Sequence, residues 1–289
     1  MKIYILPVSK EFQPQGTRRK YPRHNTDDSG VEQDFVRYLN KNPSLVTSDP
    51  NSADWHYLPI YWTRYHKHHD HGKYGLGPLQ EEVKRRIIND SRTFTICQWD
   101  GNPLVDVGET RLFLAARKET AGIDIPILCS PHRIPMIKPA KKYLASFVGR
   151  LATHPIRYDM NRQLGKRRDV YVRDRAKGTR FFVKQMLRSY IALCPRGSSC
   201  GSFRFYEAMQ LGVVPMLIGD VDTRPFKTFV DWDKISLYAR SIEEARDILD
   251  SHTTAELLQL GQLASEVWRE KLTFGKWCRY VVRELEAIS

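Results

Sequence analysis

The segment from Arg196 to Glu207 holds the residue types best suited to binding a phosphate group. Its centre is small and polar, and consists of Gly197, Ser198, Ser199, Gly201 and Ser202. Small residues let the backbone approach a ligand closely, and Arg196 and Arg204 add fixed positive charge. The same pattern is also typical of a tight turn followed by a favourable acidic residue near a helix start. Because it matches neither standard glycine-rich fingerprint, spacing alone leaves both interpretations open.

The elements around this segment predict where such a ligand would lie. An apolar run over 190–193 stops at Pro195, helical spacing follows over 203–211, and a second apolar run covers 213–218. This order of strand, turn, helix and strand builds parallel sheets. The turn therefore falls at a helix start, where unpaired N–H groups and the helix dipole favour a phosphate. Glu207, on the first turns of the helix, is placed to bind a ribose diol.

Several short strings in this region resemble the signature of the exostosin-type glycosyltransferases, family 47. They are Cys194-Pro195-Arg196-Gly197, Ser202-Phe203-Arg204, Tyr206-Glu207-Ala208, Gly212 and Pro215. The resemblance is sharpest over residues 190–219. It implies an α/β fold of two Rossmann-like domains facing a central cleft, the GT-B arrangement. It also implies an inverting transfer of a sugar from a UDP-sugar to a hydroxyl of a glycan, forming a β-glycosidic bond of xylosyl, galactosyl or glucuronosyl type.

A protein of another class fits the same resemblance. Exostosin-like chains can work as pairs, so a non-catalytic, basic module that binds a glycan or assists a partner transferase is the alternative. In the catalytic interpretation, the partners are the UDP-sugar donor and an oligosaccharide or glycoprotein glycan acceptor. Slow cleavage of a UDP-sugar would separate the two interpretations.

Alternating strand and helix patterns predict two domains and a final helix. Residues 1–140 are expected to bind the acceptor, and residues 141–272 the nucleotide sugar. A helix within 273–289 is expected to pack back on the first domain. Arg150 follows a strand predicted over 143–149, and ligands collect at the carboxyl ends of parallel strands. Arg150 is therefore a second candidate for binding the diphosphate, with a surface salt bridge as its alternative role.

Inversion also needs a general base, which is sought in the first domain. Asp70 and Asp100 are the first candidates, and His69 or His71 is the second choice. Asp70 lies in the histidine-rich segment 61–72, for which a metal site, an acceptor pocket and a solvated loop all stay open.

A short acidic string in the second half resembles a metal motif. Asp220-Val221-Asp222 is similar to the Asp-x-Asp that holds a divalent ion in another glycosyltransferase architecture. An acidic turn explains the string equally well. The helix start and the arginines make a metal-free mechanism plausible, so we expect that no metal ion or other cofactor is required.

Composition argues against several classes of protein. The formal net charge of +13 points to polyanions, but no nucleic-acid-binding motif accompanies the basic clusters. The five cysteines are scattered without a Cys-x-x-Cys pair, which indicates neither a zinc site nor a disulfide framework. No apolar run reaches the ~18 residues that a membrane span needs. These features predict a cytoplasmic protein that does not bind nucleic acid, and they leave its oligomeric state open.

Overall fold

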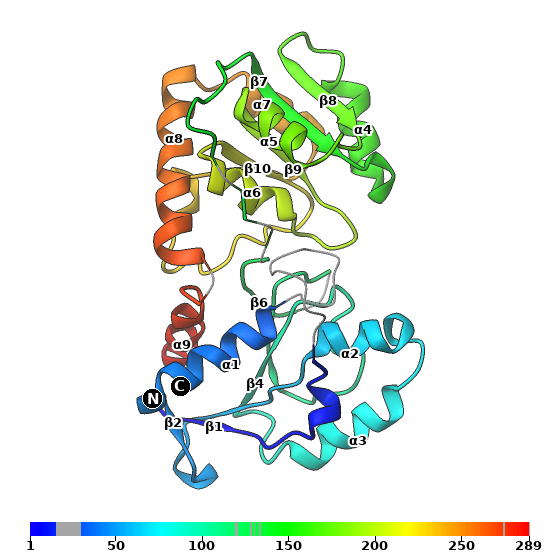
Figure 1. The fold of residues 1–289 in the computed structure, drawn as a ribbon, viewed down its shortest axis with the longest axis vertical. Helices are drawn as coiled ribbons and strands as arrows, with labels where there is room; N and C mark the ends of the chain where they lie inside the picture. The colour runs from blue at the N-terminus through cyan, green and yellow to red at the C-terminus, as the bar shows by residue number, and fades with distance from the viewer. Residues whose placement is uncertain are drawn as a thin grey trace. The chain divides into compact units, whose positions relative to one another are not determined.

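The computed structural model describes residues 1–15, 30–118, 121–127, 129, 131–132, 134–273 and 275–288, in two compact units (Figure 1). Unit 1 comprises Met1–Leu128 and Thr273–Ser289, and unit 2 comprises Cys129–Leu272. Each unit contains a parallel sheet with helices packed on it, so the predicted α/β fold of two Rossmann-like domains is confirmed. Among the described helices, none has the length and apolar character that crossing a membrane requires.

The sheet of unit 1 has the strand order β2-β1-β3-β4-β5-β6, and every pairing in it is parallel. Its strands are β1 (Ile3–Ile5), β2 (Val46–Thr47), β3 (Trp55–Tyr57), β4 (Thr93–Cys97), β5 (Arg111–Leu114) and β6 (Ile123–Asp124). Its helices are α1 (Val31–Lys41), α2 (Trp62–His68), α3 (Leu76–Arg86) and α9 (Cys278–Ala287).

The core of unit 1 explains why these segments fold as they do. Strands β3 and β4 are buried along their whole length, as expected for parallel strands covered on both faces. Helix α1 places Phe35 against this sheet, with its ring 5.0 Å from that of Tyr57 and 5.6 Å from that of Phe94. Trp277, at the start of α9, lies 6.3 Å from Phe35, so the end of the chain closes the core of unit 1. In Figure 1, α9 lies beside α1.

The sheet of unit 2 has the strand order β11-β10-β9-β7-β8, again parallel throughout. Its strands are β7 (Tyr143–Gly149), β8 (Val170–Asp174), β9 (Ser189–Pro195), β10 (Val214–Ile218) and β11 (Leu237–Ala239). Its helices are α4 (Pro155–Leu164), α5 (Thr179–Leu187), α6 (Phe203–Leu211), α7 (Ile242–Leu249) and α8 (Thr254–Val267). Phe147, Leu193 and Met216 belong to its core, together with Met160 of α4 and Leu249 of α7.

The two sheets share one topology. In each, the first strand of the unit lies between the second and the third, and later strands add on the side of the third. The first strands are β1 and β7, flanked by β2 and β3 and by β8 and β9. In open sheets of this kind, ligands bind outside the carboxyl ends of the strands where the direction of winding reverses. The fold therefore marks one edge of each unit as the place to look for a site.

The boundary between the units differs from the one predicted at residue 140. The first segment of unit 1 runs to Leu128, and Cys129 and His132, which follow it, contact α6 of unit 2. The backbone N–H of His132 donates to Gln210 Oε1 at 3.0 Å, and Gln210 Nε2 lies 2.9 Å from Cys129 Sγ. These contacts form between residues distant in sequence, which periodicity could not predict.

Candidate functional site

The carboxyl ends of β7 and β9 bring together two predicted parts of the site. Arg150 directly follows β7, and the turn from Arg196 to Ser202 directly follows β9. Because β7 and β9 are paired in parallel, both segments leave the sheet at the same edge. This edge is where the direction of winding reverses in unit 2, so the fold places both segments where a ligand is expected.

Arg157 of α4 ties these two strand ends together. Its Nε donates to Arg196 O at 2.9 Å, its Nη1 to Arg150 O at 2.9 Å and its Nη2 to Pro195 O at 3.2 Å. The side chain is buried, and burial together with the charge of Arg204 lowers its pKa to about 10. Sequence reasoning missed this role, because Arg157 stands in an ordinary helical pattern.

Arg204, on the first turn of α6, is a second buried cation at this edge. Its Nη2 donates to Val148 O at 2.7 Å, and its guanidinium carbon lies 4.2 Å from the centre of the Phe147 ring. Its Nε is buried without a hydrogen-bond partner among the described residues. Burial lowers its pKa from the usual value. A buried cation without a paired carboxylate is costly unless a ligand neutralises it.

Arg196 is the third buried cation, and it has an acidic partner. Its Nη1 forms an ion pair with Asp220, which follows β10, while its Nε lacks a partner in the described chain. Burial acts to raise the pKa of Asp220, but the hydrogen bond from Arg196 prevails and lowers it.

The predicted metal role of the Asp220–Asp222 string gains no support from these contacts. Asp222 accepts from Arg224 Nε at 2.9 Å and pairs with Lys227 Nζ at 3.1 Å, while Asp220 is held by Arg196. Both carboxylates are thus engaged by basic side chains. In the described parts of the chain, no group of three His, Cys, Asp or Glu side chains is arranged to hold a metal ion.

Glycines at three strand ends lie against the three arginines, and at two of them a side chain would crowd the guanidinium group. The pairs are Gly149 with Arg204, Gly197 with Arg157, and Gly219 with Arg196. A Cβ atom at Gly149 would overlap Arg204 Nη2, and one at Gly197 would lie 3.0 Å from Arg157 Nη2. At Gly219 the nearest atoms would be those of Arg196, at 3.4 Å. The glycines therefore serve the packing of guanidinium groups as well as the turn itself.

The turn between β9 and α6 is more enclosed than the sequence indicated. Ser198 is exposed, whereas Gly197 and residues 199–202 are buried. The N–H of Gly197 donates to Ser199 O at 3.1 Å, so this amide is already occupied within the turn. Ser202 precedes α6 without a side-chain cap, which leaves the start of the helix open to another acceptor.

Glu207 has a partner that the sequence did not predict. Its Oε1 lies 2.9 Å from His132 Nε2, and both side chains are buried. His132 comes from the segment that precedes β7, and its ring lies 5.7 Å from that of Phe182 on α5. His132 thus orients the carboxylate that we predicted to bind ribose.

The predicted bases lie on unit 1 in different surroundings. Asp70 is exposed, has a backbone φ of 46° and pairs with Lys73 Nζ at 2.8 Å. The His69 ring stacks on Tyr65 at 4.0 Å, and its Nδ1 lies 2.7 Å from Tyr65 O. Asp100 is half-buried and follows β4.

The histidine-rich segment is not simply a loop, because its first half forms α2. Three of its histidines, His66, His69 and His71, pack against aromatic rings. His66 is fully buried, and burial lowers its pKa to about 4. The rings of His66 and His71 both pack on Trp99, at 5.6 Å and 5.5 Å.

Comparison with known proteins decides the family. The exostosin GT47 domain model matches residues 98–252, more than half of the chain. The chain belongs to the exostosin GT47 family. Exostosin-1 of Drosophila melanogaster is 33% identical over 94 residues, which cover 30% of this chain and 12% of that protein. A probable glucuronosyltransferase of Oryza sativa subsp. japonica is 28% identical over 174 residues, covering 52% and 40%. The chain thus spans less than half the length of these two relatives.

A solved structure is also similar at low identity. Sucrose-phosphate synthase from Thermosynechococcus elongatus has a TM-score of 0.41 and 11% identity, covering 95% of this chain and 83% of that one. The exostosin GT47 match itself includes Asp100, Arg150, the 196–202 turn and Glu207, whereas Asp70 and His69 precede it.

A further acidic residue of this exostosin-family chain was not predicted from the sequence. Glu32, on the first turn of α1, is fully buried. Its Oε1 accepts from Thr63 N at 3.2 Å, Thr63 Oγ1 at 2.8 Å and Gln98 N at 3.1 Å. Its Oε2 has no partner among the described residues, and burial raises its pKa. The only sequence signal was its position in the helix that follows the first strand.

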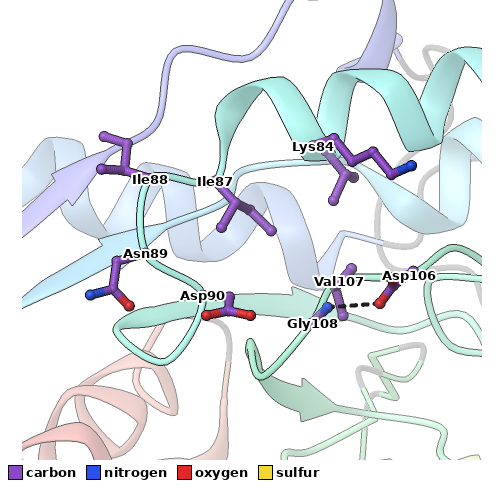
Figure 2. Close-up of a pocket in the computed structure, with 9 residues that line it drawn as sticks. Lys84, Ile87, Ile88, Asn89, Asp90, Asp106, Val107 and Gly108 are labelled. Carbon is purple, nitrogen blue, oxygen red and sulfur yellow. Dashed lines mark hydrogen bonds between the residues drawn. The ribbon is translucent and has the colours of Figure 1, made fainter.

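A hollow on unit 1 lies apart from all of these residues (Figure 2). It is formed by the end of α3, the segment before β4 and the loop at 106–108, so it is not at the carboxyl ends of the strands. Asp90 Oδ2 accepts from Glu109 N at 3.1 Å and Asp106 Oδ1 from Gly108 N at 3.0 Å. Its two carboxylates therefore already hold the backbone, and none of the predicted site residues lines it.

Proposed function

We propose that this chain is an inverting glycosyltransferase that binds a UDP-sugar at the carboxyl edge of the sheet of unit 2. The observation that carries the proposal is the set of three buried guanidinium groups at this edge, of which only Arg196 forms an ion pair among the described residues. Buried charges in proteins are paired or bind a ligand of opposite charge. A diphosphate supplies that charge, and membership of the exostosin GT47 family supports a nucleotide sugar as its source.

The residues at this edge have different roles in the proposed reaction. Arg196, Arg204 and Arg150 neutralise the charge that develops on the leaving diphosphate, assisted by Ser198, Ser199 and Ser202 and by the start of α6. A charged hydrogen bond contributes about 1.5–3 kcal/mol, so a few of them make a metal ion dispensable. Arg157 acts through the backbone, because its donors are used on carbonyl groups. Glu207, oriented by His132, binds the ribose.

Unit 1 binds the acceptor in this proposal, with a hydroxyl of an oligosaccharide or glycoprotein glycan as the nucleophile. Because a probable glucuronosyltransferase is among the relatives, UDP-glucuronate is the first donor to test, followed by UDP-xylose and UDP-galactose. The product is a β-glycoside formed from an α-linked donor. Full activity in excess chelator is expected.

The test is UDP binding by calorimetry on the full chain. Arg196→Gln and Arg204→Gln should each weaken UDP binding at least about tenfold, a loss of about 1.4 kcal/mol, while uridine binding changes less. Arg224→Gln is the matched control, because Arg224 is also buried but is neutralised by Asp222 and Asp233. If all three variants bind UDP alike, the diphosphate lies elsewhere. Hydrolysis of a bound UDP-sugar would then separate an enzyme from a module that only binds.

A further inference from the structure

Glu32 marks the carboxyl edge of unit 1 as a site of acid–base chemistry. We propose that Glu32 is the general base that accepts the proton of the acceptor hydroxyl. The inference rests on the proposed glycosyl transfer and assigns a step that this reaction requires.

The position of Glu32 is the first argument. It stands at the start of α1, which follows β1, and its carboxylate accepts from Thr63, which follows β3. It also accepts from Gln98 N, directly after β4. One carboxylate thus connects segments that follow three adjacent strands, at the point where the winding of this sheet reverses. This is the edge at which open α/β sheets bind their ligands.

The unused polar atoms around Glu32 are the second argument. All three donors bind Oε1, while Oε2 is buried and unpartnered within the described chain. Gln98 Oε1 and the Tyr57 hydroxyl are also buried and have no hydrogen-bond partner among the described residues. Buried polar atoms nearly always have partners, so a group of orphaned ones needs an explanation. The hydroxyl groups of a sugar would supply partners for all three atoms.

The choice of a carboxylate is the third argument. A glutamine could accept hydrogen bonds from these donors through its carbonyl oxygen without placing a charge in the core. A buried carboxylate without a cation is costly, but a base works best when its pKa is raised toward the working pH. Burial raises the pKa of Glu32 in this way. Asp70, by contrast, is exposed and paired with Lys73.

The proposed step transfers the sugar to the acceptor and one proton to Glu32. The acceptor oxygen forms a bond to the anomeric carbon while the bond from that carbon to the diphosphate oxygen breaks, and its electron pair leaves with UDP. The hydroxyl proton passes to Glu32 Oε2 and is later released to solvent. Glu32 has no exposed surface in the free chain, so this step requires that acceptor binding uncovers Oε2.

The decisive variant is Glu32→Gln, measured in the full chain with donor and acceptor. We expect kcat to fall at least about 100-fold, the low end of general-base contributions, with UDP affinity unchanged and melting temperature equal or higher. Asp34→Asn is the matched control, because Asp34 is a second buried acid on α1, also with an unpartnered oxygen among the described atoms. It should keep turnover within about twofold. Near-normal turnover in Glu32→Gln would mean that Glu32 is not the base and only caps the first turn of α2.

Thr63→Val gives a second readout that does not depend on removing the carboxylate. It deletes one hydrogen bond that lowers the pKa of Glu32, so the acid limb of kcat/KM should move to higher pH. The titratable neighbours are Tyr57, Tyr61 and Cys97, whose pKa values are raised and which stay neutral in this range. The charged neighbour on α2 is Arg64, whose guanidinium carbon lies 5.8 Å from the centre of the Tyr61 ring.

The outcomes separate this inference from the function on which it rests. If Glu32→Gln fails to fold, an unmoved acid limb in Thr63→Val overturns the assignment by itself. If the wild type neither binds UDP nor cleaves a UDP-sugar, the glycosyltransferase proposal fails before Glu32 is tested. If the wild type is active and Glu32→Gln is equally active, only the assignment of the base is wrong.

Discussion

The two units share one sheet topology, but at corresponding edges they carry buried charges of opposite sign that form no ion pair with the described residues. In unit 2, Arg157 and Arg204 are buried cations that form no ion pair within the described chain. In unit 1, the carboxylate of Glu32 is buried and has no cationic partner among the described residues. The topology places both groups where ligands bind, and the side chains decide which ligands those are.

In the reaction that we propose, the two edges serve different reaction partners. A leaving diphosphate gains negative charge, which buried guanidinium groups stabilise. An acceptor hydroxyl must lose a proton, which a buried carboxylate accepts. The two charges occupy the same position in their helices. Both α1 and α6 start after a strand, and the second residue is Glu32 in α1 and Arg204 in α6. Each prediction below perturbs one edge and uses the other as its reference.

The largest effect is expected from Arg157→Met. This change leaves the carbonyl groups of Arg150, Pro195 and Arg196 without the donors that hold the ends of β7 and β9 together. Losing several buried hydrogen bonds should lower the free energy of unfolding by about 3 kcal/mol or more, and UDP binding should be lost with it. Chemical denaturation and calorimetry measure the two effects.

Arg162→Met is the reference for the Arg157 prediction, because Arg162 lies on the same helix and is exposed, with a surface ion pair to Asp159. Exposed pairs contribute about 0–1 kcal/mol, so this variant should remain close to wild type. If the two variants are equally stable and bind UDP equally, Arg157 does not connect the strand ends.

A second prediction concerns the pH dependence of unit 1. Burial raises the pKa of Asp34 from 3.8 to about 6, against the opposing effect of Arg37. The folded state therefore holds the proton more tightly than the unfolded state. This contribution to stability is present below pH ~4 and is lost as the pH rises to ~6, at a cost of about 3 kcal/mol. The protection of the α1 backbone amides, taken relative to their intrinsic exchange rate at each pH, should fall over this window.

Asp34→Asn tests the cause of that pH dependence. An asparagine cannot ionise, so the protection of the α1 amides relative to their intrinsic exchange rate should depend much less on pH between ~4 and ~6. The pKa of Glu32 is also raised by burial, and its contribution should persist in the variant. A profile identical to that of the wild type would mean that Asp34 ionises in the folded chain as it does in the unfolded one.

The sequence predicted the elements better than the contacts between them. The strand expected over 143–149 is β7 (Tyr143–Gly149), and the helix expected over 203–211 is α6 (Phe203–Leu211). Local spacing determines such features. The role of Arg157 depends on its contacts with Arg150 and Arg196, and the burial of Glu32 depends on residues that follow β3 and β4.

Charge was the property that sequence patterns described least well. Asp220 and Asp222 form one acidic string in the sequence, but the fold gives each its own basic partner, Arg196 and Arg224. The pairing of His132 with Glu207 likewise joins segments on either side of β7 and β9. A single sequence shows which residues can ionise, but only tertiary packing shows which charges remain unpaired.

The smallest effect is expected from Gly149→Ala, which tests whether the position of Arg204 matters apart from its charge. The added methyl group would overlap Arg204 Nη2, so the guanidinium must move away from Val148 O while its charge stays in place. We expect UDP binding to weaken by about threefold to tenfold, roughly 0.6–1.4 kcal/mol. Gly77→Ala in α3 is the reference, since a Cβ there meets no atom within 4 Å and alanine favours a helix. Equal UDP affinity in the two variants would show that the cation at this edge acts through charge alone, whereas a selective loss would show that the glycine at the end of β7 sets its geometry.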